Sequence, residues 1–151
     1  MVKKSEIVRM CYDKICDDSS IYAATDGNIF MGLPEEDVEN NLSDTHETCI
    51  SITMADSISR GTQGSATSKI KDVYADVTID VGSRYNNSSM HCMDVLELIE
   101  NISFYDVSAT LGASNAYMFV TKEISKVFYD NTIKAYHGIL TLELNYRTIG
   151  T

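Results

Sequence analysis

The clearest pattern in the chain is a regular alternation of apolar and polar residues near its C-terminal end. Successive residues of a β-strand point to opposite faces, so the alternation predicts a strand from about residue 137 with one apolar and one polar face. The apolar positions are Leu140, Leu142, Leu144 and Tyr146, and the polar positions are Thr141, Glu143, Asn145 and Arg147. We expect the apolar face to pack in the core and the polar face to line an interface or a lumen.

Two further segments, residues 49–57 and residues 72–81, alternate in the same way and predict two more strands. The polar face of the second strand is acidic, because Asp72, Asp76 and Asp80 all fall on it. An acidic strand face must be solvated, paired with a partner, or turned toward an acidic lumen. Shorter strands are predicted at residues 29–33, which Pro34 ends, and near residues 107–111, 117–122 and 124–129.

Residues 57–71, between these two strands, are rich in Gly, Ser and Thr and include the basic residues Arg60, Lys69 and Lys71. Most hairpin loops have about 2–5 residues, so this segment predicts an unusually long polar hairpin tip. A polar segment without its own core commonly becomes ordered only against a partner. We therefore expect residues 57–71 to take part in assembly.

Two segments have the spacing of amphipathic helices, residues 5–16 and residues 89–102. Their apolar stripes consist of Val8, Cys11, Tyr12 and Ile15 in the first and of Cys92, Val95, Leu96 and Ile99 in the second. Strands in runs, separated by two helices, predict an α+β fold. We expect a mostly antiparallel sheet with both helices packed on one face and a long polar hairpin between its central strands. The chain shows no repeat or linker, which predicts a single domain spanning residues 1–151.

The charge balance narrows the possible partners. The chain has 22 acidic and 12 basic residues, a net charge of −10. We therefore do not expect it to bind nucleic acid by neutralising phosphates over its whole surface. No apolar run approaches the roughly 18 residues of a membrane span, and the residues after Met1 do not resemble a secretory signal. We therefore expect no membrane contact, and four cysteines that are buried thiols rather than disulfides.

Candidate catalytic and metal-binding residues are few. Cys11 and Cys16 lie on the first predicted helix without the Cys-x-x-Cys spacing that is typical of zinc sites. His137 precedes a glycine at the start of a strand and has no nucleophile in an elbow pattern nearby. The Gly-Thr-Gln-Gly segment lacks the Gly-Lys-Ser/Thr ending of a phosphate-binding loop. We expect a protein without a cofactor or metal that is not an enzyme.

The segment KVFYDNTIKAYHGILTLELNYR (residues 126–147) resembles the closing hairpin of the tail-completion family of tailed bacteriophages, the tail terminators or tail-to-head joining proteins. The positions that carry this resemblance are Phe128, Asp130, His137, Gly138, Leu140 and Leu142. The order of the predicted elements is also similar: an N-terminal helix, the segment IFMGLP (residues 29–34), a hairpin, a second helix and late strands.

The resemblance implies a virion structural protein that forms a ring, usually of six subunits, on the end of the tail tube. Such a ring would stop tube growth and dock to head-connector and portal-associated proteins, while DNA passes without specific binding. Assembly would occur in the host cytoplasm and the final location would be the tail or neck of the virion. The residues expected at an interface or in the lumen are Arg60, Lys69, Lys71, Asp76, Asp80, Glu143 and Arg147.

Two other hypotheses remain open from the sequence. The chain could be another virion protein, such as a neck adaptor, a tail-hub ring protein or a tube-like subunit. It could instead be a small α+β ligand-binding or enzymatic domain that uses the acidic residues of 72–81. Asp76 and Asp80 are four residues apart on one strand, about 13 Å at about 3.3 Å per residue, which is too far for a carboxylate dyad.

Overall fold

The structure is a computed structural model in which residues 4–32, 41–54, 58–63, 69–104 and 118–150 are described. Three α-helices lie in this part of the chain: α1 (Lys4–Asp17), α2 (Ser19–Thr25) and α4 (Ser89–Glu100). A short 3-10 helix, η1 (Tyr85–Asn87), precedes α4. The predictions of α1 and α4 are confirmed. None of the helices in the described residues is long and apolar enough to cross a membrane.

The helix α2 was not expected from the sequence. It begins after Asp18, whose Oδ1 accepts hydrogen bonds from the backbone N–H groups of Ser20 and Ile21, both at 3.0 Å. A side-chain acceptor at this position satisfies N–H groups that have no partner within the helix. The helix ends at Asp26, which adopts the left-handed conformation (φ 51°), as helix C-termini often do. Ser88 caps α4 in the same way, through its Oγ and the N–H of Met90.

Seven strands form one sheet within the described residues. They are β1 (Ile29–Met31), β2 (Thr48–Met54), β3 (Ile58–Gln63), β4 (Lys69–Ser83), β5 (Met118–Ile124), β6 (Phe128–Asp130) and β7 (Ala135–Gly150). The main order is β1-β2-β4-β7-β5, while β3 pairs with β4 and β6 pairs with β7. Only β1–β2 is parallel among these pairs. The α+β class with a mostly antiparallel sheet is thus confirmed.

Two details of the predicted strands are wrong. Residues 57–71 do not form one long hairpin tip: β3 occupies Ile58–Gln63, and β4 begins at Lys69. Backbone pairing with β4, with a register shift between Arg60 and Thr62, outweighs the low strand propensity of this Gly/Ser/Thr-rich segment. In addition, Ile124 belongs to β5 and β6 has only three residues. The predicted strand at residues 107–111 lies outside the described residues.

The core lies between the helices and one face of the sheet, which we call the inner face. It includes Ile50, Ile52, Val77, Ile79, Val81, Leu140, Leu142 and Leu144 from the sheet, and Ile7, Cys11, Ile15, Ile21, Cys92, Val95, Leu96 and Ile99 from the helices. The strand alternation therefore identified the buried positions correctly within residues 77–81 of β4 and 140–144 of β7. Gly138 explains how closely α4 approaches β7, because a Cβ at this position would lie 2.3 Å from Cδ1 of Leu96.

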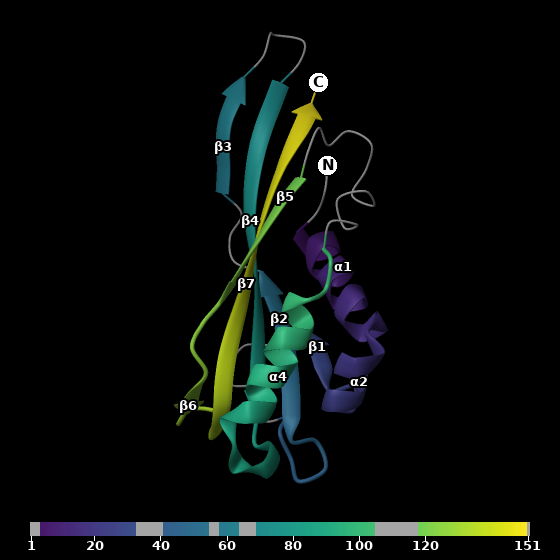
Figure 1. Ribbon diagram of the computed structural model, residues 1–151. Helices are drawn as coiled ribbons and strands as arrows, with labels where there is room; N and C mark the ends of the chain where they lie inside the picture. The colour runs from purple at the N-terminus through teal and green to yellow at the C-terminus, as the bar shows by residue number, and fades with distance from the viewer. Residues whose placement is uncertain (1–3, 33–40, 55–57, 64–68, 105–117, 151) are drawn as a thin grey trace.

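The helices cover only one end of the sheet (Figure 1). In the other half, β3 and the adjoining parts of β4 and β7 extend beyond the helices. We call residues 58–63, 69–74 and 145–150 the distal arm, and the helix-covered remainder of the described residues the body. The distal arm contains four basic residues and one acidic residue, so the rest of the chain carries 8 of the 12 bases and 21 of the 22 acids. Of these, 7 bases and 15 acids lie in the body, so the arm is basic and the body is acidic.

Candidate functional site

The face of the sheet turned away from the helices, which we call the polar face, contains three of the residues expected at an interface or lumen. Asp76 on β4 lies directly opposite Glu143 on β7, and Asp80 lies four residues farther along β4 on the same face. Asp76 is half-buried and Glu143 is exposed. Like charges in directly opposite positions of an antiparallel pair destabilise a sheet. This acidic pair does not help the fold, and its negative charge faces whatever lies over the polar face.

The other four residues of the predicted set lie on the distal arm. Arg60 on β3 and Arg147 on β7 both occupy positions opposite Asp72 of β4. Lys71 precedes Asp72 on β4, and Lys69 is the first residue of this strand. Both residues therefore lie farther along the arm from the body than Asp72 does. The spacing from Asp76 to Lys71 is five residues, about 17 Å at about 3.3 Å per residue. The predicted residues thus form two separate groups, an acidic one on the body and a basic one on the arm.

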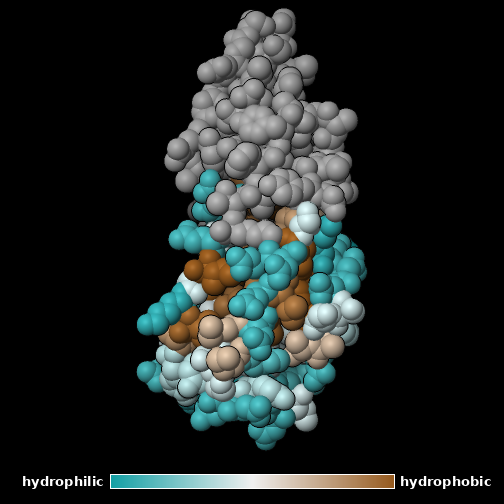
Figure 2. All heavy atoms as spheres, in the orientation of Figure 1, coloured by the Kyte–Doolittle hydropathy of each residue, from teal (hydrophilic) through white to brown (hydrophobic). Residues whose placement is uncertain are grey.

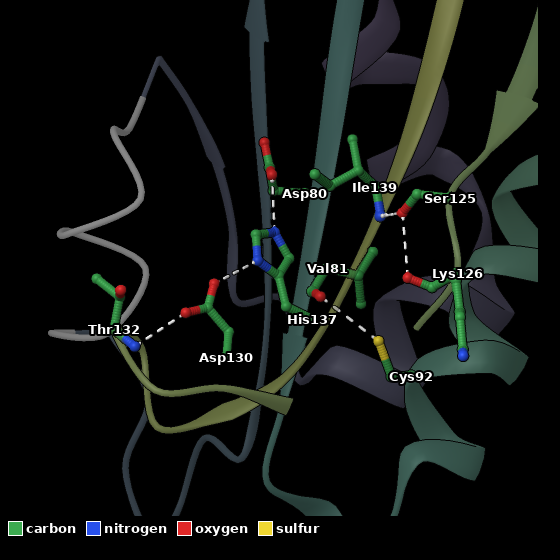
Figure 3. Close-up of polar contacts among 9 residues, drawn as sticks. All are labelled: Asp80, Val81, Cys92, Ser125, Lys126, Asp130, Thr132, His137 and Ile139. Carbon is green, nitrogen blue, oxygen red and sulfur yellow. Dashed lines mark hydrogen bonds and ion pairs between the residues drawn. The ribbon is translucent and has the colours of Figure 1, made fainter. Parts of the chain in front are cut away.

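A buried histidine links three strands at the end of the polar face that lies farthest from the arm (Figure 3). His137 on β7 lies between two carboxylates: Nε2 is 2.8 Å from Oδ1 of Asp80 on β4, and Nδ1 is 2.9 Å from Oδ2 of Asp130 on β6. The other oxygen of Asp130, Oδ1, accepts a hydrogen bond from the backbone N–H of Thr132 at 2.9 Å. Only 5% of the His137 side chain is exposed.

The two carboxylates determine the charge of this histidine. Burial lowers the pKa of His137, but the hydrogen bonds to Asp80 and Asp130, together with their negative charges, outweigh burial and leave the pKa raised. In the protonated ring both nitrogens carry a hydrogen and donate, one to each carboxylate. Because both ring nitrogens are engaged, His137 acts in this arrangement as a brace between β4, β6 and β7. The geometry therefore gives His137 a structural role at this end of the sheet.

A second set of contacts fixes the same end of the sheet. The guanidinium of Arg84 donates from Nε to the carbonyl oxygen of Lys134 at 3.0 Å and from a terminal nitrogen to that of Ile133 at 3.1 Å. A small apolar cluster lies there, consisting of Leu42, Cys49, Ile133 and Ala135 with Phe30 packed against it. The turn between β6 and β7 is therefore held by Arg84 and by the histidine brace.

The cysteines behave as core residues. Cys11, Cys49 and Cys92 are buried and Cys16 is half-buried, and all four thiols are free. Burial raises the pKa values of Cys11, Cys49 and Cys92 to about 12, so these thiols are protonated at neutral pH. In the described part of the chain no group of three or more His, Cys, Asp or Glu residues could hold a metal ion.

Comparison with known proteins adds one likeness of fold. No protein-family model and no curated protein sequence matches this chain. Among solved structures, a chain of the virion of a native gene transfer agent particle matches with a TM-score of 0.53 and 11% sequence identity, over 93% of this chain and 92% of that chain. The two chains share a fold. The likeness covers body and arm together, since it spans nearly the whole length of both proteins.

Sequence reasoning identified the polar face but missed the brace. Asp80 was expected to meet solvent, a partner or a lumen, whereas it bonds to His137, 57 residues away. The only local signal was Asp130, seven residues before His137 across a tight turn. Whether the seven predicted residues contact a partner stays a prediction.

Proposed function

We propose that this chain is a structural protein of a phage-like virion that acts at the head–tail interface. It would form a ring that completes the tail and docks it to the head connector while leaving a channel for DNA. The observation that carries this proposal is the shared fold with a chain of a gene transfer agent virion over almost the full length of both chains. The resemblance of residues 126–147 to the closing hairpin of tail-completion proteins supports the same assignment.

The polar face supports a role beside DNA. Asp76 and Glu143 lie opposite each other on the two longest strands, at a cost to sheet stability. A surface of this charge repels phosphates, so DNA could move past it without being held. We therefore place the polar face toward the lumen of the proposed ring, and we expect neither catalysis nor a cofactor.

The partners of such a ring follow from its position. Each subunit, in a ring of six, would contact two other copies through different surfaces, as heterologous contacts require. One side of the ring would meet the tail tube and the other the head-connector or portal-associated proteins. Assembly would take place in the host cytoplasm, and the protein would then remain in the virion.

The main alternative is another ring or tube-like virion protein of the neck or tail, which would have similar physical requirements. A small ligand-binding domain that uses the acids of β4 has less support. Asp80 is hydrogen-bonded to His137, and neither Asp76 nor Asp80 lines the cavity beside α2 and His91 or the cavity beside α4.

Native mass spectrometry of the purified protein, followed by electron microscopy of particles labelled with an antibody to it, tests the proposal. We expect a closed ring of identical subunits and label at the junction of head and tail. Label along the whole tail would favour a tube subunit. A protein that stays monomeric at all concentrations and is missing from purified particles would contradict a virion role.

A further inference from the structure

A groove lies on the body between α4 and the segment that joins β5 to β6. Its volume is about 410 Å³. Met93 and Leu96 of α4 line one side, and Ile124 and Val127 line the other. The floor is close to the sheet because Gly138 lets Leu96 contact β7 directly. In Figure 2, brown and tan side chains gather on the lower left of the molecule, where Figure 1 places this junction.

The apolar residues of the groove are unusually accessible. Met93 is 43% exposed and Ile124 is 37% exposed. Both come from regular elements of the fold, so their exposure is a fixed property of the surface. An apolar hollow bordered by polar residues is typical of a surface that binds another protein segment.

The charge of the groove restricts what can occupy it. Glu97 and Glu100 of α4 line the groove on the helix side. Lys126 provides a single basic residue on the opposite side. The surface therefore fits a segment that combines apolar residues with an excess of lysine or arginine.

The distal arm of this same chain has that composition. Val73 on β4 and Tyr146 on β7 occupy directly opposite positions. Lys71 and Lys69 lie two and four residues before Val73, so all three belong to the same face of the strand. Within the 18 residues of the arm, basic residues outnumber acidic ones four to one.

We propose that the groove receives the distal arm of a second copy of this chain. The contact is heterologous, since groove and arm are different surfaces, so each copy offers one of each and can bind two neighbours. The inference rests on the proposed function in one respect, that the neighbour belongs to the same ring. To the proposed ring it adds the identity of the two surfaces in contact. These are the acidic edge of α4 in one subunit and the basic residues of the arm in the next.

Charge reversal tests this pairing. We would substitute Glu97→Lys with Glu100→Lys on the groove, Lys69→Glu with Lys71→Glu on the arm, and then combine all four changes in one chain. Self-association would be measured by sedimentation velocity over a concentration series. Each pair alone should raise the concentration needed for association by about tenfold or more, since like charges then face each other, and the combined variant should recover most of the loss.

Two matched controls separate the contact from general effects of charge and size. Asp13→Lys with Asp17→Lys makes the same change in charge on the exposed side of α1 and should leave association within about twofold of the wild type. Met93→Ala should weaken association, whereas Met90→Ala, on the same helix but outside the groove and 61% exposed, should not. Urea unfolding of each variant verifies that the body remains folded.

The outcomes distinguish this inference from the proposed function. If the wild type forms rings and both reversed pairs form them equally well, the groove–arm contact is wrong and the ring proposal stands. If groove variants form normal rings but fail to enter particles, another virion protein occupies the groove and the second-copy inference is overturned. If the wild type never associates and is missing from particles, both proposals fail.

Discussion

The body and the distal arm are built from the same two strands but differ in what holds them. In the body, β4 and β7 bury Val77, Ile79, Leu140 and Leu142 beneath the helices. In the arm, the same strands continue past the helices with β3 beside β4 (Figure 1). In the body, the β4–β7 pair thus stabilises the fold. In the arm, the backbone pairing of the same two strands places basic residues at a distance from the acidic body.

This difference predicts that stability and assembly are separable along a single strand. Apolar burial contributes about 25 cal/mol per Å², so substitutions in the body should act mainly on the free energy of unfolding. We expect substitutions in the arm or on the polar face to act mainly on association. The predictions below test this division, beginning with the largest expected effect on stability.

Leu142→Ala should have the largest effect. Leu142 is fully buried at the centre of β7, and removing a core leucine side chain costs about 2–5 kcal/mol. Urea unfolding followed by circular dichroism measures this change. Thr141→Ala, next in sequence and on the polar face, is the matched control and should cost well under half as much. Equal losses at both positions would contradict the assignment of the two faces.

His137→Phe should destabilise the body by about 1–3 kcal/mol at pH 6, because two carboxylates lose their donors. The effect should depend on pH. A raised pKa in the folded state means that the brace contributes fully below the unfolded pKa of about 6.5 and that its contribution is lost as pH rises through the folded pKa of His137.

The measurement is the free energy of unfolding of wild type and His137→Phe from pH 5.5 to pH 9. The gap between the two proteins should narrow with rising pH. A gap that is constant, or that widens, would show that the ionic contacts of His137 do not contribute as the geometry indicates.

Shortening the arm should affect stability less. Arg60 and Asp72 lie directly opposite each other, so replacing residues 61–71 by Asn-Gly would close β3 and β4 with a two-residue turn that hairpins favour. We expect the free energy of unfolding to change by less than about 1 kcal/mol, while ring formation measured by native mass spectrometry is lost. Normal rings from this variant would mean that the arm has no part in assembly.

Glu143→Lys should have the smallest effect on stability, less than about 0.5 kcal/mol. The direction should be favourable, because the change removes a like-charge pair with Asp76. The yield of infectious particles should nevertheless fall, since a lysine on the polar face would attract phosphates. An unchanged yield would indicate that this face meets only water.

The features that the sequence predicted well are long and strictly periodic. The alternation in β7 and the apolar stripe of α4 each repeat often enough to outweigh local exceptions. In contrast, α2 has only seven residues, and its main signal was the capping residue Asp18. The segment that forms β3 has the composition of a loop, and its strand conformation depends on pairing with β4.

The candidate functional site shows the same limit of prediction from local sequence patterns. Asp76 and Asp80 were assigned to the polar face of one strand and Glu143 to that of another, because alternation alone places residues on a face of their own strand. The bond between Asp80 and His137 requires the register of β4 against β7, which no local pattern contains. The groove between α4 and the β5–β6 connection was also not predicted, because it depends on how a helix and a distant segment pack.

The register of β4 and β7 has a mechanical consequence. Their pairing runs without interruption from Lys69 opposite Gly150 to Ser83 opposite Tyr136. Because both strands continue from the arm into the body, a load that pulls the arm along the strand axis passes through their two backbones. It acts in shear on the hydrogen bonds that join them to β2 and β5, so those bonds share the load and do not break one at a time. The strand pair is therefore a stiff lever, and a push or pull at the arm is delivered to the histidine brace at its opposite end.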